Sequence, residues 1–125
     1  METDGKRFKL TKSNRLVLNR DFQKVFECGK LYRTTALTIY VLPTDNKVFR
    51  LGIVTSRKLG NAVKRNLIKR RLREIFRLNK HRFVPAKDMS GYDMIFLPQK
   101  SALNLSYTSL ENIVFNIWKR ANLIS

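Results

Sequence analysis

One stretch of this chain, residues 51–77, joins a strand-like run to a strongly basic helix. Its sequence is LGIVTSRKLGNAVKRNLIKRRLREIFR. At helical spacing its apolar residues share one side of the helix, and they are Ile68, Leu72, Ile75 and Phe76. The other side carries Asn66, Arg70, Arg73 and Arg77. The stretch therefore predicts a helix that packs one face against a core and offers phosphate-binding side chains on the other.

The whole chain is strongly basic. Its 125 residues include 26 Lys and Arg but only 9 Asp and Glu, which gives a formal net charge of +17. Within residues 57–82 the only acid is Glu74, whereas a helix face that is merely solvated normally mixes both signs. Arginine forks at fixed helical spacing can hold phosphates of a folded RNA by its shape. The charge therefore indicates a nucleic-acid partner.

Apolar spacing along the rest of the chain predicts an α+β fold. Helical and strand-like segments follow one another in the order αβββαβα, so we expect a two-layer single domain with helices packed on a small mixed sheet. The expected helices cover residues 19–28, 61–80 and 106–121. The expected strands lie within residues 31–42, as one strand or a broken pair, and within 49–54 and 92–97.

Local residues predict how these elements end. Gly29 stands where a helix commonly closes with a left-handed cap. Residues 43–46, of sequence PTDN, have turn composition. Thr108 and Glu111 have the spacing of a capping box at the start of the last helix.

Composition divides the chain into a tail and a domain. Residues 1–17 are polar and basic with few apolar anchors, so we expect an N-terminal arm that orders on binding. Residues 18–125 should form a single RNA-binding domain. The start of the chain lacks the apolar core of a signal peptide, and no run approaches the ~18 apolar residues of a membrane span. Cys28 is the only cysteine, which excludes an intrachain disulfide and suits a cytoplasmic protein.

A second surface is predicted from aromatic residues. Tyr40 alternates with Ile39 and Val41 along its strand, so it should face away from them. Phe22 and Phe26 share a face of the first helix and could lie beside Tyr40 in a shallow cleft. Such a cleft with basic flanks would stack single-stranded RNA. Phenylalanines at helical spacing are more often core residues, and the sequence alone favours that alternative.

The sequence offers no obvious catalytic site. His81 is the only histidine, which excludes a two-histidine ribonuclease mechanism. The acids are scattered, with no close pair for two-metal catalysis, and no Cys/His spacing fits zinc. A glycine-rich phosphate loop is also missing. We therefore expect no catalytic residue, metal or cofactor in the protein itself.

Three segments, in order, resemble the signature of the bacterial ribonuclease P protein family. The first is DFQKVF at residues 21–26, and the second is RKLGNAV at residues 57–63, extended by a basic helix. The third and weaker one is YDMIF at residues 92–96. The chain departs from the family pattern at two positions. Leu67 stands where the family's Arg-Asn-Arg triplet has its last arginine, and Gln99 stands where the family often has an arginine just after the last strand.

This resemblance implies a set of roles. The protein would bind the catalytic RNA subunit of ribonuclease P through Asn61, Lys64, Arg65, Asn66, Lys69, Arg70, Arg73 and Arg77. It would bind the 5′ leader of precursor tRNA through a second set of residues, namely Phe22, Phe26, Tyr40, Arg57 and Lys58. Catalysis, with its Mg²⁺, would reside in the RNA, and no protein partner is required. The resemblance also implies a left-handed β-α-β crossover to the last strand, against the usual right-handed rule.

Two other functions compete with a ribonuclease P subunit. A small ribosomal or RNA-assembly protein that binds structured ribosomal RNA would share the charge but not the three ordered motifs. A free-standing nuclease conflicts with the missing acid and base.

Overall fold

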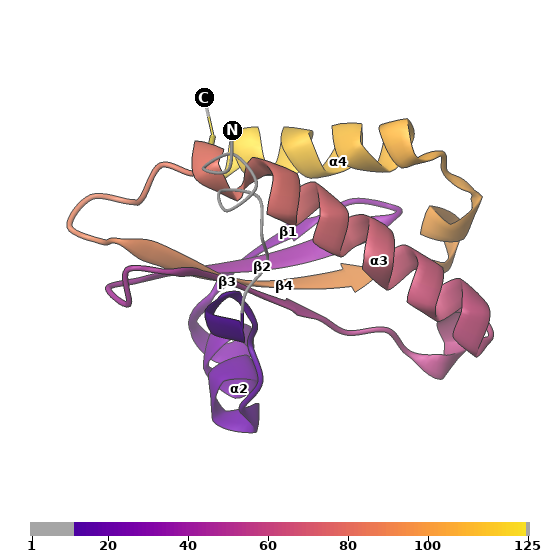
Figure 1. The fold of residues 1–125 in the computed structure, drawn as a ribbon, viewed down its shortest axis with the longest axis horizontal. Helices are drawn as coiled ribbons and strands as arrows, with labels where there is room; N and C mark the ends of the chain where they lie inside the picture. Colours follow the sequence, from indigo (N-terminus) through magenta and orange to yellow (C-terminus); the bar gives the residue numbers. More distant parts are fainter. Residues whose placement is uncertain (1–11, 125) are drawn as a thin grey trace.

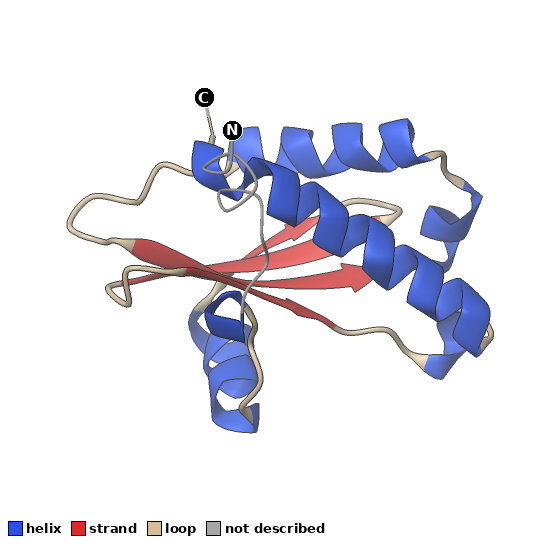
Figure 2. Cartoon of the chain, in the orientation of Figure 1, coloured by secondary structure: helices blue, strands red, loops and turns tan. Residues whose placement is uncertain are grey.

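A mixed four-stranded sheet carries helices on both faces (Figures 1 and 2). The computed structural model of the chain describes residues 12–124. Its strands are β1 (Lys30–Arg33), β2 (Leu37–Thr44), β3 (Phe49–Ile53) and β4 (Gly91–Pro98). Its α-helices are α2 (Asn19–Cys28), α3 (Ala62–Asn79) and α4 (Tyr107–Arg120). Short 3-10 helices are η1 (Lys12–Asn14), η2 (Arg57–Leu59), η3 (Lys80–Arg82) and η4 (Lys100–Asn104). The predicted α+β class and element order are confirmed.

The strand order places β3 at an edge of the sheet. The order is β1-β2-β4-β3, in which β2 runs antiparallel to β1 and β4, and β3 runs parallel to β4. The helix α3 connects the two parallel strands. In Figure 1, β3 lies in front of β4 and α3 lies above both. That geometry makes the connection left-handed, against the usual rule, as the family resemblance implies.

The two faces of the sheet pack against different helices. Ile39 and Val41 point toward α3 and α4, where they join the larger core with the apolar face of α3. Tyr40 points to the opposite face, where Val25 of α2 packs against Ile95. Figure 1 shows α2 on the side of the sheet away from α3 and α4. The predicted two-layer arrangement therefore holds for α3 and α4, and α2 adds a partial third layer.

Two side chains of α2 fix its position on β3. Arg50 of β3 donates two hydrogen bonds to the carboxylate of Asp93 at 2.7 and 2.6 Å, and it forms an ion pair with Asp21 of α2 at 3.4 Å. The hydrogen bond to Asp93 raises the pKa of Arg50, although burial opposes it. The ring of Phe22 lies over Gly52, where a Cβ atom would come within 2.5 Å of it. The neighbouring residues Asp21 and Phe22 thus anchor α2 by charge and by packing.

Residues 12–16 of the expected arm lie along β3. The N–H of Leu16 donates to the carbonyl of Leu51 at 3.0 Å, and the side chain of Asn14 donates to the carbonyl of Phe49 at 2.8 Å. Leu16 is 6% exposed. Two buried residues, Asn14 and Leu16, therefore anchor this segment, which the polar composition of residues 1–17 did not indicate. Residues 1–11 lie outside the described part of the chain.

The prediction for Gly29 was wrong. It has φ −74° and ψ 157°, which is extended backbone. Its N–H donates to the carbonyl of Val25 at 2.8 Å, and a Cβ atom would lie 2.5 Å from that oxygen. Glycine permits this close approach as the chain passes from α2 directly into β1, so no left-handed residue is needed.

Two other predicted boundaries were also displaced. Pro43 and Thr44 continue β2 along their full pairing with β4, so the turn comes after them. The capping box at Thr108 was wrong, because α4 starts earlier. Ser106 is its N-cap, and the hydroxyl oxygen accepts a hydrogen bond from the N–H of Ser109 at 3.1 Å. The predicted span of α3 was correct to within one residue at each end.

Candidate RNA-binding surfaces

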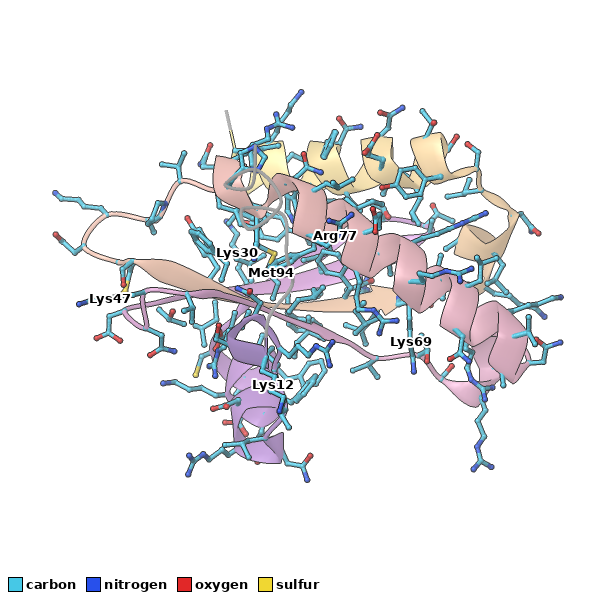
Figure 3. The ribbon with its side chains drawn as sticks, in the orientation of Figure 1. Lys12, Lys30, Lys47, Lys69, Arg77 and Met94 are labelled. Atoms are coloured by element: carbon cyan, nitrogen blue, oxygen red, sulfur yellow. The ribbon has the colours of Figure 1, made fainter. Side chains whose placement is uncertain are left out.

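The helix α3 presents a row of polar and basic side chains that we call the α3 stripe. It consists of Asn66, Arg70, Arg73 and Arg77. The apolar side of the same helix is almost fully buried, with Ile68 at 1% and Leu72 at 0% exposed. Asn66, Arg70 and Arg73 are exposed. Figure 3 shows the nitrogen-tipped side chains that project from α3, among them Lys69 and Arg77. The predicted division of faces is therefore present in the structure.

Not every predicted RNA-binding residue of α3 is equally available. The side chain of Asn61 caps the helix by accepting a hydrogen bond from the N–H of Lys64 at 2.9 Å. Arg65 donates to the carbonyl of Gly60 at 2.7 Å, so its guanidinium stabilises the helix start. Arg77 forms an ion pair with Glu74 one turn away. These local contacts leave Arg70 and Arg73 as the most available cations of the stripe.

Charge is concentrated at the end of α3 as well. Lys80 donates a hydrogen bond to the side-chain oxygen of Asn14 at 3.0 Å, which ties the helix end to residues 12–14. Burial lowers the pKa of Lys80, and the positive charge of Arg77 lowers it further. Burial is therefore the larger cause of the shift, and the neighbouring cation adds to it.

A second surface lies on the side of the sheet that α2 covers only in part. We call it the open sheet face, and it consists of Leu31, Arg33, Thr38, Tyr40 and Leu97 with Phe26 of α2. The register places Leu31 opposite Tyr40 and Thr38 opposite Leu97. A hollow of about 420 Å³ lies at the end of this face beside the β1–β2 turn, lined by Arg33, Thr34, Thr35, Thr38, Tyr40, Leu97 and Gln99.

The structure brings Tyr40 and Phe26 together, as expected. Their ring centroids lie 5.0 Å apart in an edge-to-face arrangement. Phe26 is 38% exposed and Tyr40 is half-buried, so both rings retain surface that an incoming base could contact. Phe22 differs, because its ring lies over Gly52 at the β3 edge. The alternative of a core role therefore applies to Phe22 more than to the other two aromatics.

Arg57 and Lys58 lie in the connection between β3 and α3. Both belong to η2 and are exposed. Neither lines the hollow beside Tyr40. Since Val54 donates its N–H to Phe96 at 3.0 Å, this connection leaves the sheet beside the end of β4. The structure therefore does not bring these two side chains together with Tyr40 in the hollow.

Sequence reasoning missed two basic residues near these surfaces. Arg33 lies on β1 opposite Thr38 and lines the hollow. Its two-residue spacing from Leu31, whose partner is Tyr40, could have placed it on the same face. Arg15, from the N-terminal segment, lines a groove together with Arg73 of α3. No spacing rule connects residues so far apart in the sequence.

The described residues contain no obvious catalytic or metal centre. Within residues 12–124, no three His, Cys, Asp or Glu side chains gather where they could ligate a metal. His81 lies exposed in η3 after the end of α3. None of the helices in the same part of the chain has the length and apolar character needed to cross a membrane. The arrangement offers cations and aromatic rings, which are suited to binding RNA.

A family model, related sequences and solved structures all match this chain to one protein family. The ribonuclease P family model matches residues 10–122. A ribonuclease P protein component of Clostridium botulinum (strain 657 / Type Ba4) is 34% identical over 113 residues, covering 90% of this chain and 97% of that protein. A solved RNase P protein mutant of Staphylococcus aureus matches with a TM-score of 0.81 at 31% identity, over 90% of this chain and 92% of that one. The RNase P protein of Thermotoga maritima matches with a TM-score of 0.74 at 33% identity, over 85% and 96% of the two chains.

Proposed function

The chain belongs to the ribonuclease P protein family, as a subunit of the endoribonuclease that matures the 5′ ends of tRNA, and on this basis we propose that its two surfaces bind two different RNAs. The α3 stripe binds the catalytic RNA subunit. The open sheet face binds the 5′ leader of precursor tRNA. The observation that carries this proposal is the position of the two surfaces on opposite sides of one sheet, one cationic and one aromatic.

The chemistry of the α3 stripe supports binding to a folded RNA. Its cations project from a helix whose other side is packed in the core, so their spacing is fixed before binding. Arg70 and Arg73 can each grip two phosphate oxygens through a planar fork. The neighbouring Lys64 and Lys69 add charge without needing a defined geometry. Such contacts recognise the shape of an RNA backbone rather than its sequence.

The open sheet face suits a single strand instead. An unpaired leader exposes its bases, and each base that stacks on an aromatic ring gains ~1–3 kcal/mol. Tyr40 and Phe26 provide half-exposed rings, while Arg33 lines the same hollow as Tyr40 and would bind phosphate. Arg57 and Lys58, exposed in η2 beyond the end of β3, would hold phosphates farther along the strand. Because mature tRNA has no leader, this face would favour the precursor.

Catalysis would belong to the RNA subunit, together with the Mg²⁺ ions that activate water. The protein's part is to bind both RNAs, to hold the leader in place and to offset phosphate repulsion. Precursor tRNA processing also leads us to propose a cytoplasmic location. The competing function, a small ribosomal or assembly protein, receives no support from the family to which the chain belongs.

Cleavage of precursor tRNA tests this proposal. We expect the protein with its RNA subunit to remove the leader more efficiently than the RNA alone at low Mg²⁺, and the protein alone to cleave nothing. The matched control is the Arg70→Glu variant added at the same concentration. Because it binds the RNA subunit weakly, cleavage in its presence should be little faster than cleavage by the RNA alone. Cleavage by the protein without RNA, or no effect of the protein on the RNA, would contradict the proposal.

A further inference from the structure

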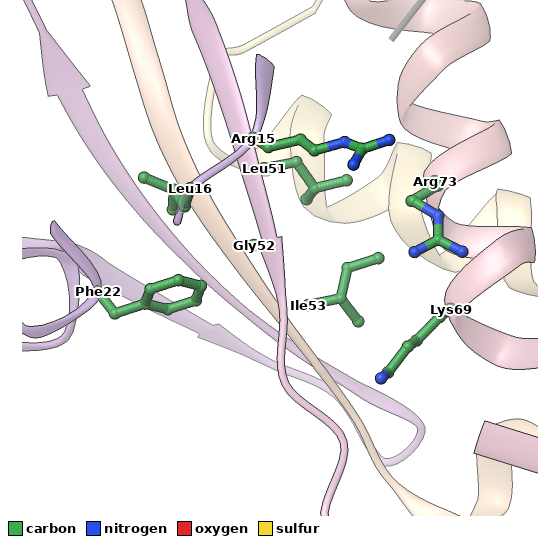
Figure 4. A pocket seen from close by; sticks show the side chains of 8 residues that line it. All are labelled: Arg15, Leu16, Phe22, Leu51, Gly52, Ile53, Lys69 and Arg73. Atoms are coloured by element: carbon green, nitrogen blue, oxygen red, sulfur yellow. The ribbon is translucent and has the colours of Figure 1, made fainter. Parts of the chain in front are cut away.

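A small groove lies at the β3 edge, between α2 and α3 (Figure 4). We call it the edge groove. Its volume is about 200 Å³, and its lining residues are Arg15, Leu16, Phe22, Leu51, Gly52, Ile53, Lys69 and Arg73. Figure 4 shows Lys69 and Arg73 reaching from α3 toward the strand, with Phe22 on the far side of it. The edge groove therefore lies between the α3 stripe and the side of the sheet that carries α2.

Three cations line this groove and no acidic side chain does, although Glu74 lines a neighbouring hollow with Arg15 and Arg73. Arg15 comes from the N-terminal segment, and Lys69 and Arg73 come from α3. Within residues 12–124 the ion pairs are Arg50 with Asp21 and Asp93, and Arg77 with Glu74. None of them involves the three groove cations. Like charges held together in this way repel one another, and the repulsion is relieved when an anion binds between them.

The floor of the groove adds hydrogen-bonding groups of the backbone. The carbonyl of Leu51 faces away from β4, because it accepts the N–H of Leu16. Backbone groups of residues two apart on a parallel strand point to the same side, so the N–H and C=O of Ile53 also face this edge. Within residues 12–124, the backbone bridge between the N-terminal segment and β3 joins Arg15 and Leu51, so Ile53 lies beyond it. An unpaired strand edge is thus present beside the cations.

The size of the groove limits what can occupy it. Its volume lies below the ~300–1,000 Å³ of typical small-molecule sites, so it suits one compact group. Three cations and a strand edge favour a phosphodiester with part of its ribose. The apolar side of the groove, from Ile53 to Phe22, can contact the sugar.

We propose that the edge groove clamps one phosphodiester of an RNA strand between Arg15 on one side and Lys69 and Arg73 on the other. Arg15 is then an RNA-binding residue of this protein, although it lies outside α3. The inference rests on the proposed RNA-binding function. The strand is either part of the RNA subunit or part of precursor tRNA, since both offer the same phosphodiester chemistry.

A double-mutant cycle tests the clamp directly. We measure the affinity of Arg15→Ala, Arg73→Ala and the double variant in two settings. One is assembly with the RNA subunit, and the other is binding of precursor tRNA to the assembled complex. In the setting that uses the groove, Arg15→Ala should weaken binding roughly ten-fold, as expected for loss of one charge-assisted contact. In the Arg73→Ala background the same change should cost less than about two-fold, because the phosphate is already released.

The salt dependence gives an independent readout. Arg15→Ala should lower the slope of log affinity against log salt by about 0.7–0.9, the contribution of one phosphate contact. Thermal melting should be unchanged, because the side chain of Arg15 is exposed. Lys119→Ala is the matched control, since Lys119 is exposed at the end of α4, outside all three surfaces, and the variant loses the same charge.

Additive losses from Arg15→Ala and Arg73→Ala in both settings, or no loss from Arg15→Ala in either, would overturn the clamp. The Arg70→Glu variant separates this outcome from a failure of the proposed function, because Arg70 does not line the edge groove. If Arg70→Glu weakens RNA binding while Arg15→Ala does not, only the clamp is wrong. If neither variant changes RNA binding, the proposed function is wrong as well.

Discussion

The α3 stripe comes from one helix, whereas the open sheet face is assembled from four elements. The stripe is a consequence of helical periodicity, since burying Ile68 and Leu72 leaves the opposite side to solvent. The open sheet face exists only because α2 is placed so that it covers part of the sheet. Arg50 and Gly52 of β3 determine that placement through Asp21 and Phe22.

This difference separates two ways of recognising RNA. The stripe relies on charge at fixed spacing, which should be sensitive to salt and insensitive to the packing of neighbouring elements. The open sheet face relies on half-exposed rings, whose availability depends on how α2 and the sheet pack together. Substitutions in the stripe should therefore weaken RNA binding without changing stability. Some substitutions in the open sheet face should change RNA binding and stability together.

The largest effect is expected from reversing charge on the stripe. The Arg70→Glu, Arg73→Glu double variant should weaken assembly with the RNA subunit at least about a hundred-fold, because two charge-assisted contacts are lost and replaced by repulsion. Its melting temperature should stay within a few degrees of the wild type, measured by circular dichroism. A Lys87→Glu, Lys119→Glu variant carries the same change in charge at exposed positions elsewhere and should assemble nearly normally. A collapsed melting curve for the stripe variant would mean that the two faces of α3 are not independent.

The next effect separates the two phenylalanines of α2. Phe22→Ala should lower the free energy of unfolding by about 2–4 kcal/mol, less than for a fully buried ring, because it uncovers Gly52 and leaves a cavity. Phe26→Ala should cost much less stability, because its ring is 38% exposed. Urea denaturation of both variants gives the comparison. Equal destabilisation would show that both rings serve the core and would weaken the role of Phe26 in leader binding.

Tyr40 provides the test of stacking. Tyr40→Ala should weaken binding of precursor tRNA to the assembled complex by ~1–3 kcal/mol and leave binding of mature tRNA almost unchanged. Tyr40→Phe keeps the ring and should keep most of the affinity, which makes it the matched control. Equal losses for the two tRNAs, after correction for the folded fraction, would assign Tyr40 to the core instead.

The smallest effect concerns the ion pair within the stripe. Glu74 holds Arg77, so Glu74→Gln should release this cation and strengthen assembly with the RNA subunit by ~0.2–1 kcal/mol, the range for exposed pairs. Glu111→Gln removes the same charge on α4 and should have a smaller effect. The affinity for the RNA subunit should be titrated at low salt, because salt screening reduces the effects of both substitutions. Weaker assembly of Glu74→Gln would mean that the ion pair positions Arg77 for binding.

Periodicity allowed much of this structure to be predicted. The faces of α3 and the alternation of Ile39, Tyr40 and Val41 follow from local geometry that one sequence contains. The position of Leu16 could not be predicted, because its partner Leu51 lies far along the chain. Gly29 was misassigned for a related reason, since close approach to a carbonyl and a left-handed turn both select glycine.

The candidate sites show the same limit. The exposure of Arg70 and Arg73 followed from helical spacing, whereas the use of Asn61 and Arg65 in local hydrogen bonds required coordinates. The position of Arg15 near α3 could not be predicted, because the tertiary fold alone brings these distant parts of the sequence together. The sequence predicted no role for Leu67 or Gln99, because the family pattern is broken at both positions.

One measurement tests the division of labour between the two surfaces most directly. Two quantities are determined for Arg70→Glu and Tyr40→Ala at one salt and Mg²⁺ concentration. They are the affinity of the protein for the RNA subunit, and the ratio of precursor to mature tRNA affinity for the fully assembled complex. We expect Arg70→Glu to lower the first and keep the second, and Tyr40→Ala to do the reverse. If each variant changes both quantities in the same proportion, the protein has one continuous RNA surface, and the division proposed above is wrong.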